Sequence, residues 1–188
     1  FAAQIYDINV NKFSKLEDNN IPYFLRIISS LNHPSIISFK GFSPLSFKNK
    51  PNPVIVTEYA FNGNLSDFLE KERNPTNYIH WSNTKKLINI YGIASGMMYL
   101  HSQDIVHRKL QASSILLDNS LHPKISSLRN SKKLNEKTDL TDSEIFVEPS
   151  YVAPEIWQRK GYSKPSDVYA FAMIVYEIIT NKKPQQQS

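Results

Sequence analysis

The sequence predicts an α+β fold built in two lobes, a small lobe rich in strands followed by a lobe made mostly of helices. Two observations lead to this fold class. The chain starts with strand-like runs and one helical pattern, and its two longest helical patterns, residues 81–102 and 165–180, come later. Because strands and helices segregate along the chain instead of alternating, the pattern favours an α+β arrangement over a parallel sheet of βαβ units.

Four elements are expected in the first lobe. FAAQIYDI (1–8) is short and apolar, and SIISFKGF (35–42) and PVIVTEYA (53–60) are β-branched and aromatic, so all three are predicted to be strands. FLRIISSL (24–31) carries apolar residues at i, i+3, i+4 and i+7, which predicts a helix. The polar, Asn-rich segment 9–20 is expected to be a loop.

The second lobe is expected to begin with a short helix at 65–72 and to contain the clearest helix of the chain at 81–102. Ser82 is placed to cap the N-terminus of the longer helix. Gly92 and Gly96 each cost about 1 kcal/mol of helix propensity relative to alanine, so we expect a neighbouring element to approach closely there. Six apolar residues are predicted to form the buried stripe of this helix: Leu87, Ile90, Tyr91, Ala94, Met97 and Met98.

Short strands and a long loop are expected before the last helix. IVH (105–107), SILLD (114–118) and HPKISS (122–127) have the character of strands, and the polar segment 128–150 that of a loop. PSDVYAFAMIVYEIIT (165–180) is apolar almost all round, which predicts a buried helix. Because loops between strands often carry functional groups, the loop between the first two of these strands is a candidate site.

Composition excludes several classes of function. The chain has no cysteine, which rules out disulfides, thiolate metal sites and cysteine nucleophiles and is expected of a reducing, cytoplasmic compartment. Its net charge of +5 comes from scattered basic residues without the basic–aromatic interleaving of nucleic-acid grooves, so no nucleic-acid partner is expected. The longest near-apolar run, residues 168–180, is too short to span a bilayer and contains Glu177, so no membrane partner is expected.

Several segments carry a family resemblance in their order along the chain: NHPSIISFKGF (32–42), VTEYAFNGNL (56–65), GMMYLHSQDIVHRKL (96–110), YVAPEIW (151–157) and SDVYAFAMIVYEIITNKKP (166–184). With them the sequence resembles a eukaryotic protein kinase, most closely the tyrosine-kinase-like serine/threonine branch. The resemblance implies a partial two-lobed kinase fold, in which residues 1–60 belong to the N-lobe up to the hinge and residues 61–188 to the C-lobe. We therefore expect the chain to be a piece of a longer kinase-like region.

The resemblance also implies which residues stand at the positions that carry phosphotransfer in the family. Those positions hold a lysine and a glutamate that place the phosphates, an aspartate, a lysine and an asparagine of the catalytic loop, and a metal-binding aspartate. None of these positions keeps its family residue in this chain. Gln4 and Phe24 stand at the positions of the lysine and the glutamate that place the phosphates. Lys109, Gln111 and Ser114 stand at those of the catalytic-loop aspartate, lysine and asparagine, and Ser127 stands at that of the metal-binding aspartate.

These substitutions predict a catalytically inactive kinase-like domain, a pseudokinase. A lysine amine is protonated at neutral pH, so Lys109 cannot accept the proton of a substrate hydroxyl. Mg²⁺ requires several hard oxygen ligands, usually including a carboxylate, which the hydroxyls of Ser114 and Ser127 do not replace. Loss of a general base alone costs about 10²–10⁴ in rate, and loss of the metal removes a main electrostatic contribution. No intact catalytic residue and no metal site are expected.

A degenerate nucleotide cleft is implied between the lobes, with no cofactor expected to be required. The hinge backbone at Glu58 and Ala60 could still hydrogen-bond an adenine, so binding of ATP without productive Mg²⁺ remains open. Lys109 is then either a phosphate contact or a solvated lysine at the mouth of an unused cleft. The expected wall of the cleft consists of Ala2, Gln4, Thr57, Glu58, Ala60 and Leu116.

Two stacks of side chains are implied to join the lobes. One consists of His107, Leu128, Ile28 and Phe39, anchored on Asp167, and the other of Ala2, Leu65, Leu116, Ile174 and Ile178. With this scaffold kept and the chemistry lost, the expected role is a binding or allosteric signalling module for a protein partner, either an active kinase or a substrate protein.

Two alternatives stay open. The first is an active ATP-dependent serine/threonine kinase with relocated catalytic groups, for which Asp104 and Asp118 are the nearest acids, one before the loop and one on the strand beyond it. The second is a decayed gene product with no folded role. Turnover with ATP and Mg²⁺ would separate the first from a pseudokinase, and cooperative unfolding would argue against the second.

Overall fold

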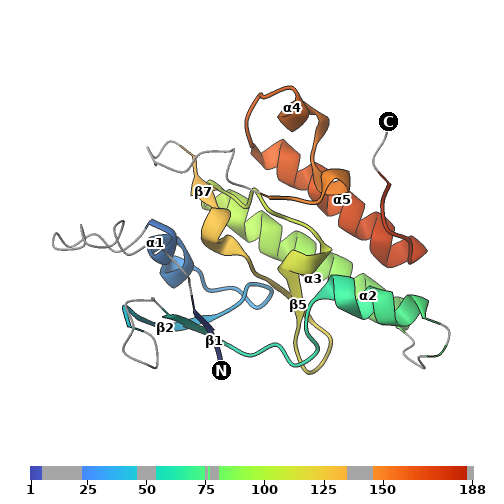
Figure 1. The fold of residues 1–188 in the computed structure, drawn as a ribbon, viewed down its shortest axis with the longest axis horizontal. Helices are drawn as coiled ribbons and strands as arrows, with labels where there is room; N and C mark the ends of the chain where they lie inside the picture. The colour runs from blue at the N-terminus through green and yellow to red at the C-terminus, as the bar shows by residue number, and fades with distance from the viewer. Residues whose placement is uncertain (6–22, 46–53, 75, 77–80, 135–145, 186–188) are drawn as a thin grey trace.

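The computed structural model describes residues 1–5, 23–45, 54–74, 76, 81–134 and 146–185, and it confirms the predicted fold class. A three-stranded sheet and one helix lie on one side of the molecule, and the long helices lie on the other (Figure 1). The first lobe contains β1 (Ala2–Ile5), α1 (Tyr23–Ser30), β2 (Phe39–Ser43) and β3 (Val54–Thr57). The second contains α2 (Leu65–Arg73), α3 (Asn83–Ser102), β4 (Ile105–Val106), η2 (Ala112–Ser114), β5 (Ile115–Leu117), β6 (Pro123–Ile125), η3 (Leu128–Asn130), β7 (Lys132–Lys133), η5 (Pro149–Tyr151), α4 (Pro154–Trp157) and α5 (Lys164–Thr180).

The sheet of the first lobe is antiparallel, with strand order β1-β3-β2. Its central strand, β3, buries the side chains of Val54 and Ile55, which are adjacent in the chain and so project from opposite faces of the sheet. The register places Ala2 opposite Thr57 and Gln4 opposite Ile55. Helix α1 forms as predicted, but of the four apolar residues at the predicted spacing only Ile27 is buried, and Leu25, which lies outside that spacing, is buried beside it.

The strand predicted at 35–42 begins only at Phe39, because the backbone before it pairs with the second lobe. The amide of Ile37 donates to the carbonyl of Ile125 over 2.9 Å, and the amide of Ile125 donates to the carbonyl of Ser35 over 2.7 Å. Ser35 and Ile36 are both buried at this contact. These bonds join the two lobes through the backbone, independently of the hinge.

Helix α3 starts as predicted but buries a different face. Ser82 is its N-cap, and the Ser82 side chain accepts a hydrogen bond from the amide of Lys85. Of the predicted stripe only Met97 is buried, whereas Tyr91 and Met98 are 75% and 70% exposed. The buried residues are instead Asn89, Ile93, Gly96, Met97 and Leu100. The prediction was wrong because it followed the apolar residues, while the packing of β6 selects the face that carries the small ones.

The two glycines of α3 mark the closest contact between this helix and the lobe junction. A Cβ at Gly92 would lie 2.5 Å from Cγ of Pro123, and a Cβ at Gly96 would lie 2.6 Å from Cδ1 of Ile125 and 3.2 Å from the carbonyl oxygen of Ser35. Real Cβ atoms do not approach other atoms so closely. The expectation that these glycines admit a neighbouring element is therefore confirmed.

Replacing Gly96 by alanine is expected to lower the free energy of unfolding by about 1–2 kcal/mol. Overpacking a filled site typically costs about 1–3 kcal/mol, and the contacts with Ile125 and with a backbone carbonyl place Gly96 in the upper part of this range, at about 2–3 kcal/mol. The better helix propensity of alanine returns about 1 kcal/mol. Urea denaturation at 25 °C measures the change. Gly41→Ala is the matched control, since no atom lies within 4 Å of a Cβ at Gly41. A Gly96→Ala variant as stable as the parent chain would contradict the contact with Ser35.

The last described helix, α5, packs against α3 in the second lobe (Figure 1). Ala170, Ile174 and Ile178 are buried on its inner face, but Val168 and Ile179 are 57% and 62% exposed, so the helix is not buried all round as predicted. Within the described residues, none of the helices combines the length and the apolar character needed to cross a bilayer.

The segment predicted as a long loop, 128–150, contains short ordered elements. It includes η3 and β7, and β7 pairs antiparallel with β4, placing Val106 opposite Lys132. Its end enters η5, where Tyr151 is buried. Residues 135–145 lie outside the described residues.

Candidate functional site

A cavity of about 670 Å³ lies between the lobes, where the resemblance places the nucleotide. Helix α1, strands β2 and β3, the loop after β4, strand β5 and the segment after β6 all contribute to its wall. The described lining residues are Phe24, Ile28, Ile37, Phe39, Ile55, Thr57, Lys109, Ser113, Leu116, Ser126, Ser127, Leu128, Arg129, Asn130 and Phe146. No acidic residue is among them, and the charged ones, Lys109 and Arg129, are both cationic.

Only part of the predicted nucleotide wall lines this cavity. Thr57 and Leu116 do so, whereas Ala2, Glu58 and Ala60 do not. Gln4 lies on β1 in register with Ile55 of the central strand. The described wall of the cavity thus includes α1 and Thr57 but not Glu58 or Ala60.

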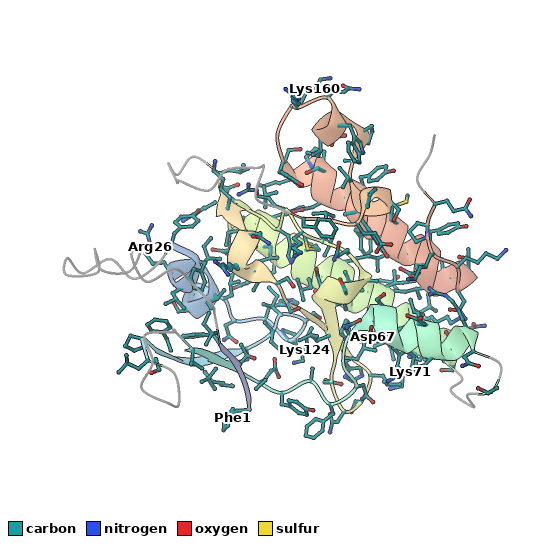
Figure 2. The ribbon with its side chains drawn as sticks, viewed as in Figure 1. Phe1, Arg26, Asp67, Lys71, Lys124 and Lys160 are labelled. Carbon is teal, nitrogen blue, oxygen red and sulfur yellow. The ribbon has the colours of Figure 1, made fainter. Side chains whose placement is uncertain are left out.

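The hinge residue Glu58 is held by both lobes. Its amide donates to the carbonyl of Ser38 over 2.9 Å, and its Oε1 accepts from the amide of Ser38 over 2.8 Å. Its Oε2 lies 3.3 Å from Nζ of Lys124, which is labelled on β6 in Figure 2. Its carbonyl accepts from the hydroxyl of Thr57 over 3.0 Å. The backbone groups of Glu58 are therefore already engaged within the chain.

The candidate loop fixes Lys109 through its neighbours. The hydroxyl of Ser114 donates to the carbonyl of Lys109 over 2.6 Å, and the amide of Lys109 donates to Nδ1 of His107 over 3.2 Å. Ser114 is only 1% exposed, and it is absent from the described wall of the cavity. Its hydroxyl therefore stabilises the loop and does not face a ligand. Lys109 itself is half-buried and lines the cavity.

Gln111 is also committed to the chain. Its Nε2 donates to the hydroxyl of Ser113 over 2.6 Å, and its Oε1 accepts from the amide of Glu148 over 3.0 Å. Gln111 therefore ties the loop to the segment that enters η5. It is not among the described residues that line the cavity.

Ser127 reaches the cavity from a left-handed backbone conformation. Its φ and ψ are 61° and 27°, its side chain is exposed, and the chain turns into η3 directly after it. A non-glycine residue with such a φ is uncommon and is held there by its surroundings. Leu128, the next residue, is 4% exposed and packs in the core, which fixes the turn.

The loop rests on a buried carboxylate from α5. Asp167 is 2% exposed, and it accepts hydrogen bonds from the amides of His107 and Arg108 over 2.8 and 3.1 Å. Nε2 of His101 lies 3.0 Å from the same carboxylate. Arg108 has a φ of 66°, so this carboxylate holds a left-handed turn in the loop.

His107 is a neutral, structural histidine. It is fully buried, and burial lowers the pKa of its ring even though the nearby carboxylate of Asp167 acts in the opposite direction. Nδ1 of His107 accepts from the amide of Lys109, so Nε2 carries the proton and donates to the carbonyl of Ser126 over 2.8 Å.

Several members of the two expected stacks lie in the core or line the cavity. Leu128 belongs to the core cluster, and Ile28 packs against that cluster from α1. Phe39 lines the cavity, as does Leu116 of the second stack. The members of the second stack that come from α2 and α5 are all fully buried: Leu65, Ile174 and Ile178.

One buried charged cluster, which joins α5 to α2 and η5, was not predicted from the sequence. Glu177 of α5 is 1% exposed, its Oε1 lies 2.5 Å from Nη2 of Arg73 on α2, and its other oxygen accepts from the hydroxyl of Tyr151. Burial, followed by the contact with Glu177, raises the pKa of Tyr151. The signal available in the sequence was a glutamate inside an apolar helix, which requires a buried partner.

The described residues offer a poor donor set for a divalent cation. No group of three or more His, Asp or Glu side chains comes together within the part of the chain that the structure covers. The positions equivalent to the family's metal ligands present a hydroxyl bound to a backbone carbonyl, Ser114, and a lone hydroxyl, Ser127. Mg²⁺ prefers near-octahedral oxygen ligation that includes carboxylates. These residues therefore do not fit a magnesium ion.

Comparisons with known proteins agree in one family. The family model "Protein tyrosine and serine/threonine kinase" matches residues 10–188. A serine/threonine-protein kinase/receptor of Acanthamoeba polyphaga mimivirus is 34% identical over 185 residues, which cover 95% of this chain and 11% of the viral protein. Cysteine-rich receptor-like protein kinase 7 of Arabidopsis thaliana is 31% identical over 178 residues, covering 93% of this chain and 26% of the plant protein.

A vertebrate protein gives a similar match. Mitogen-activated protein kinase kinase kinase 13-A of Xenopus laevis is 29% identical over 180 residues, covering 95% of this chain and 17% of the frog protein. The chain thus spans between 11% and 26% of the length of these relatives.

Proposed function

Because the chain belongs to the protein tyrosine and serine/threonine kinase family, we propose that it is a pseudokinase domain, a binding or allosteric signalling module without phosphotransfer activity. The single observation that carries this proposal is the charge of the cleft. Its described wall includes two cations and no carboxylate. Phosphoryl transfer depends on metal ions held by carboxylates and on a base for the substrate hydroxyl, and this wall supplies neither.

The hydrogen bonds of the loop support the same proposal. Ser114 and Gln111 are bound to backbone groups of the chain, so they would have to break those bonds before contacting a nucleotide. The amide of Glu58 is likewise engaged, and its carbonyl already accepts one bond from Thr57. ATP therefore enters the proposal only as a ligand without productive Mg²⁺, and no cofactor is required.

The alternative, an active kinase with relocated acids, has little geometric support. Asp104 is paired with Lys164 over 2.6 Å, and the contact with Lys164 lowers the pKa of this exposed carboxyl. Asp118 accepts from the amides of Ser120 and His122 over 2.8 and 2.9 Å in the turn between β5 and β6. Neither carboxylate is among the described residues that line the cavity.

The proposed partner is a protein, either an active kinase or a substrate protein. Nucleic acid and membrane are not proposed as partners, and the proposed compartment is the cytoplasm. The kept scaffold supports a binding role, because the lobes remain joined through the backbone at Ile125, and Ile28 of α1 packs against the core cluster that contains Leu128. Two folded lobes can present a partner surface without chemistry in the cleft.

We expect no phosphotransfer above background from this chain with ATP and Mg²⁺, and no gain from Lys109→Asp alone. A restored base cannot act alone, because without metal ligands the chain would still lack the metal ion that stabilises the charge of the transferring phosphoryl group. Transfer of ³²P from labelled ATP to a generic acceptor protein and to the chain itself measures this. Lys109→Gln is the matched control, since it removes the same charge without supplying a base. Turnover by the unmodified chain that disappears when the cleft is blocked would overturn the proposed function.

A further inference from the structure

We infer that the cavity between the lobes binds an apolar, aromatic ligand with one acidic group, held by Lys109 and without a metal ion. This inference rests on the proposed function, because it assumes that the cleft has been released from phosphotransfer. The ligand differs from a magnesium nucleotide in charge, in metal dependence and in the part of the cleft that it occupies.

The inner end of the cavity offers an apolar wall from three directions. Phe24 and Ile28 face it from α1, Ile55 faces it from β3, and Leu128 closes it from the segment after β6. Phe24 stands at the position of the family's phosphate-placing glutamate, so an acidic group has been replaced by a large aromatic one. Burying an aromatic or aliphatic group against such a wall is favourable, whereas a phosphate finds no favourable contact with it.

The polar part of the wall includes two cations, Lys109 and Arg129, and the hydroxyl of the neighbouring Ser126 is already bonded. The hydroxyl of Ser126 donates to the carbonyl of Ser114 over 2.9 Å, and Lys109 is held in the loop by its own backbone bonds. Among the residues that the structure describes, none forms a salt bridge with the ammonium of Lys109 within 4 Å. One acidic group on the ligand would supply that charge, and a charge-assisted hydrogen bond is roughly twice as strong as a neutral one.

The shape of the cavity argues against a nucleotide. Its volume of about 670 Å³ lies within the range of roughly 300–1,000 Å³ typical of small-molecule sites. Ala2, Glu58 and Ala60 are not among its described lining residues, so a ligand held by the residues that are would not require the hinge contacts of an adenine. A triphosphate would bring several negative charges to a wall that provides no metal ligands. An acidic ligand without a triphosphate complements the cationic wall and needs no metal ligands from it.

A matched pair of probes tests the inference on the 188-residue chain by isothermal titration calorimetry. Naphthalene-2-sulfonate has an aromatic body and one negative charge, and naphthalene-2-sulfonamide has the same body without the charge. We expect one site that binds the sulfonate about tenfold or more tightly than the sulfonamide. The affinity for the sulfonate should be the same in EDTA and in MgCl₂.

Two variants separate the charged end from the apolar wall. Lys109→Met should remove the preference for the sulfonate and leave the affinity for the sulfonamide unchanged, and Phe24→Ala should weaken both probes by similar factors. Lys160→Met is the control for charge, because Lys160 is exposed beyond α4, far from the sheet of the first lobe (Figure 2). It should change neither affinity. Thermal unfolding of each variant verifies that it is folded.

Several results would overturn the inference. They are binding of neither probe, equal affinity for both probes in the unmodified chain, a preference that survives Lys109→Met, and displacement of the sulfonate by metal-free ATP at equal or lower concentration. Phosphotransfer is measured on the same samples. Turnover would overturn the proposed function, whereas loss of probe discrimination without turnover would overturn only this inference.

Discussion

Replacing Glu177 by alanine is expected to lower the free energy of unfolding by about 3–5 kcal/mol, because removing one partner of a buried charge pair leaves the other uncompensated. Glu177 is 1% exposed and holds Arg73 of α2 and Tyr151 of η5 against α5. Arg73 keeps 23% of its side chain exposed and can recruit some water, which favours the lower end of this range. Urea denaturation at 25 °C measures the loss.

The control for Glu177 is Glu70→Ala on the exposed side of α2, which should change stability by no more than about 0.5 kcal/mol. A double variant, Arg73→Met with Glu177→Leu, should be more stable than Glu177→Ala, because replacing both charges by apolar groups leaves no buried charge unpaired. A loss of less than about 1 kcal/mol in Glu177→Ala, or a double variant less stable than Glu177→Ala, would mean that the cluster does not hold α2 to α5.

Replacing Asp167 by alanine is expected to lower the free energy of unfolding by about 3–5 kcal/mol, because it leaves two buried amides without an acceptor. Each unsatisfied buried donor costs about 1–3 kcal/mol, and the amides of His107 and Arg108 both depend on this carboxylate. The left-handed turn at Arg108 loses its support at the same time. Chemical denaturation measures the global loss, and hydrogen exchange of the two amides reports the local one.

Hydrogen exchange distinguishes this role from a general effect on packing. In Asp167→Ala the amides of His107 and Arg108 should exchange faster than expected from the change in global stability alone, while the amide of Ile125, bound to Ser35, should follow global stability. Asp67→Ala, on the exposed first turn of α2, is the control and should cost no more than about 1 kcal/mol. Unchanged protection of both loop amides would contradict the proposed anchoring.

The sequence by itself was sufficient for the fold class and for local helix signals. Segregation of strands and helices predicted the α+β architecture, and Ser82 was placed correctly as the cap of α3. The glycines of α3 were correctly expected to admit a neighbour. Such features depend on residues close together in the chain, whose preferences act whatever the rest of the molecule does.

The sequence could also place two residues of the candidate site. The residue types at the family positions identify a lysine at Lys109 and a hydroxyl at Ser127, and both line the cavity as expected. It could not predict that Ser114 and Gln111 turn away to bond the backbone, because their partners depend on how the loop closes. Nor could it predict that Glu58 and Ala60 lie outside the enclosed volume.

The tertiary structure alone decided which face of α3 is buried, where the strand after Ser35 begins, and what neutralises Glu177. Each of these depends on a partner far away in the sequence: the strand β6 for the first two, and Arg73, which is separated from Glu177 by 104 positions, for the third. Local periodicity offers α3 two possible faces, and only the close approach of Pro123 and Ile125 to its glycines selects between them. Sequence thus determines which elements can form, and long-range packing determines which of their surfaces meet.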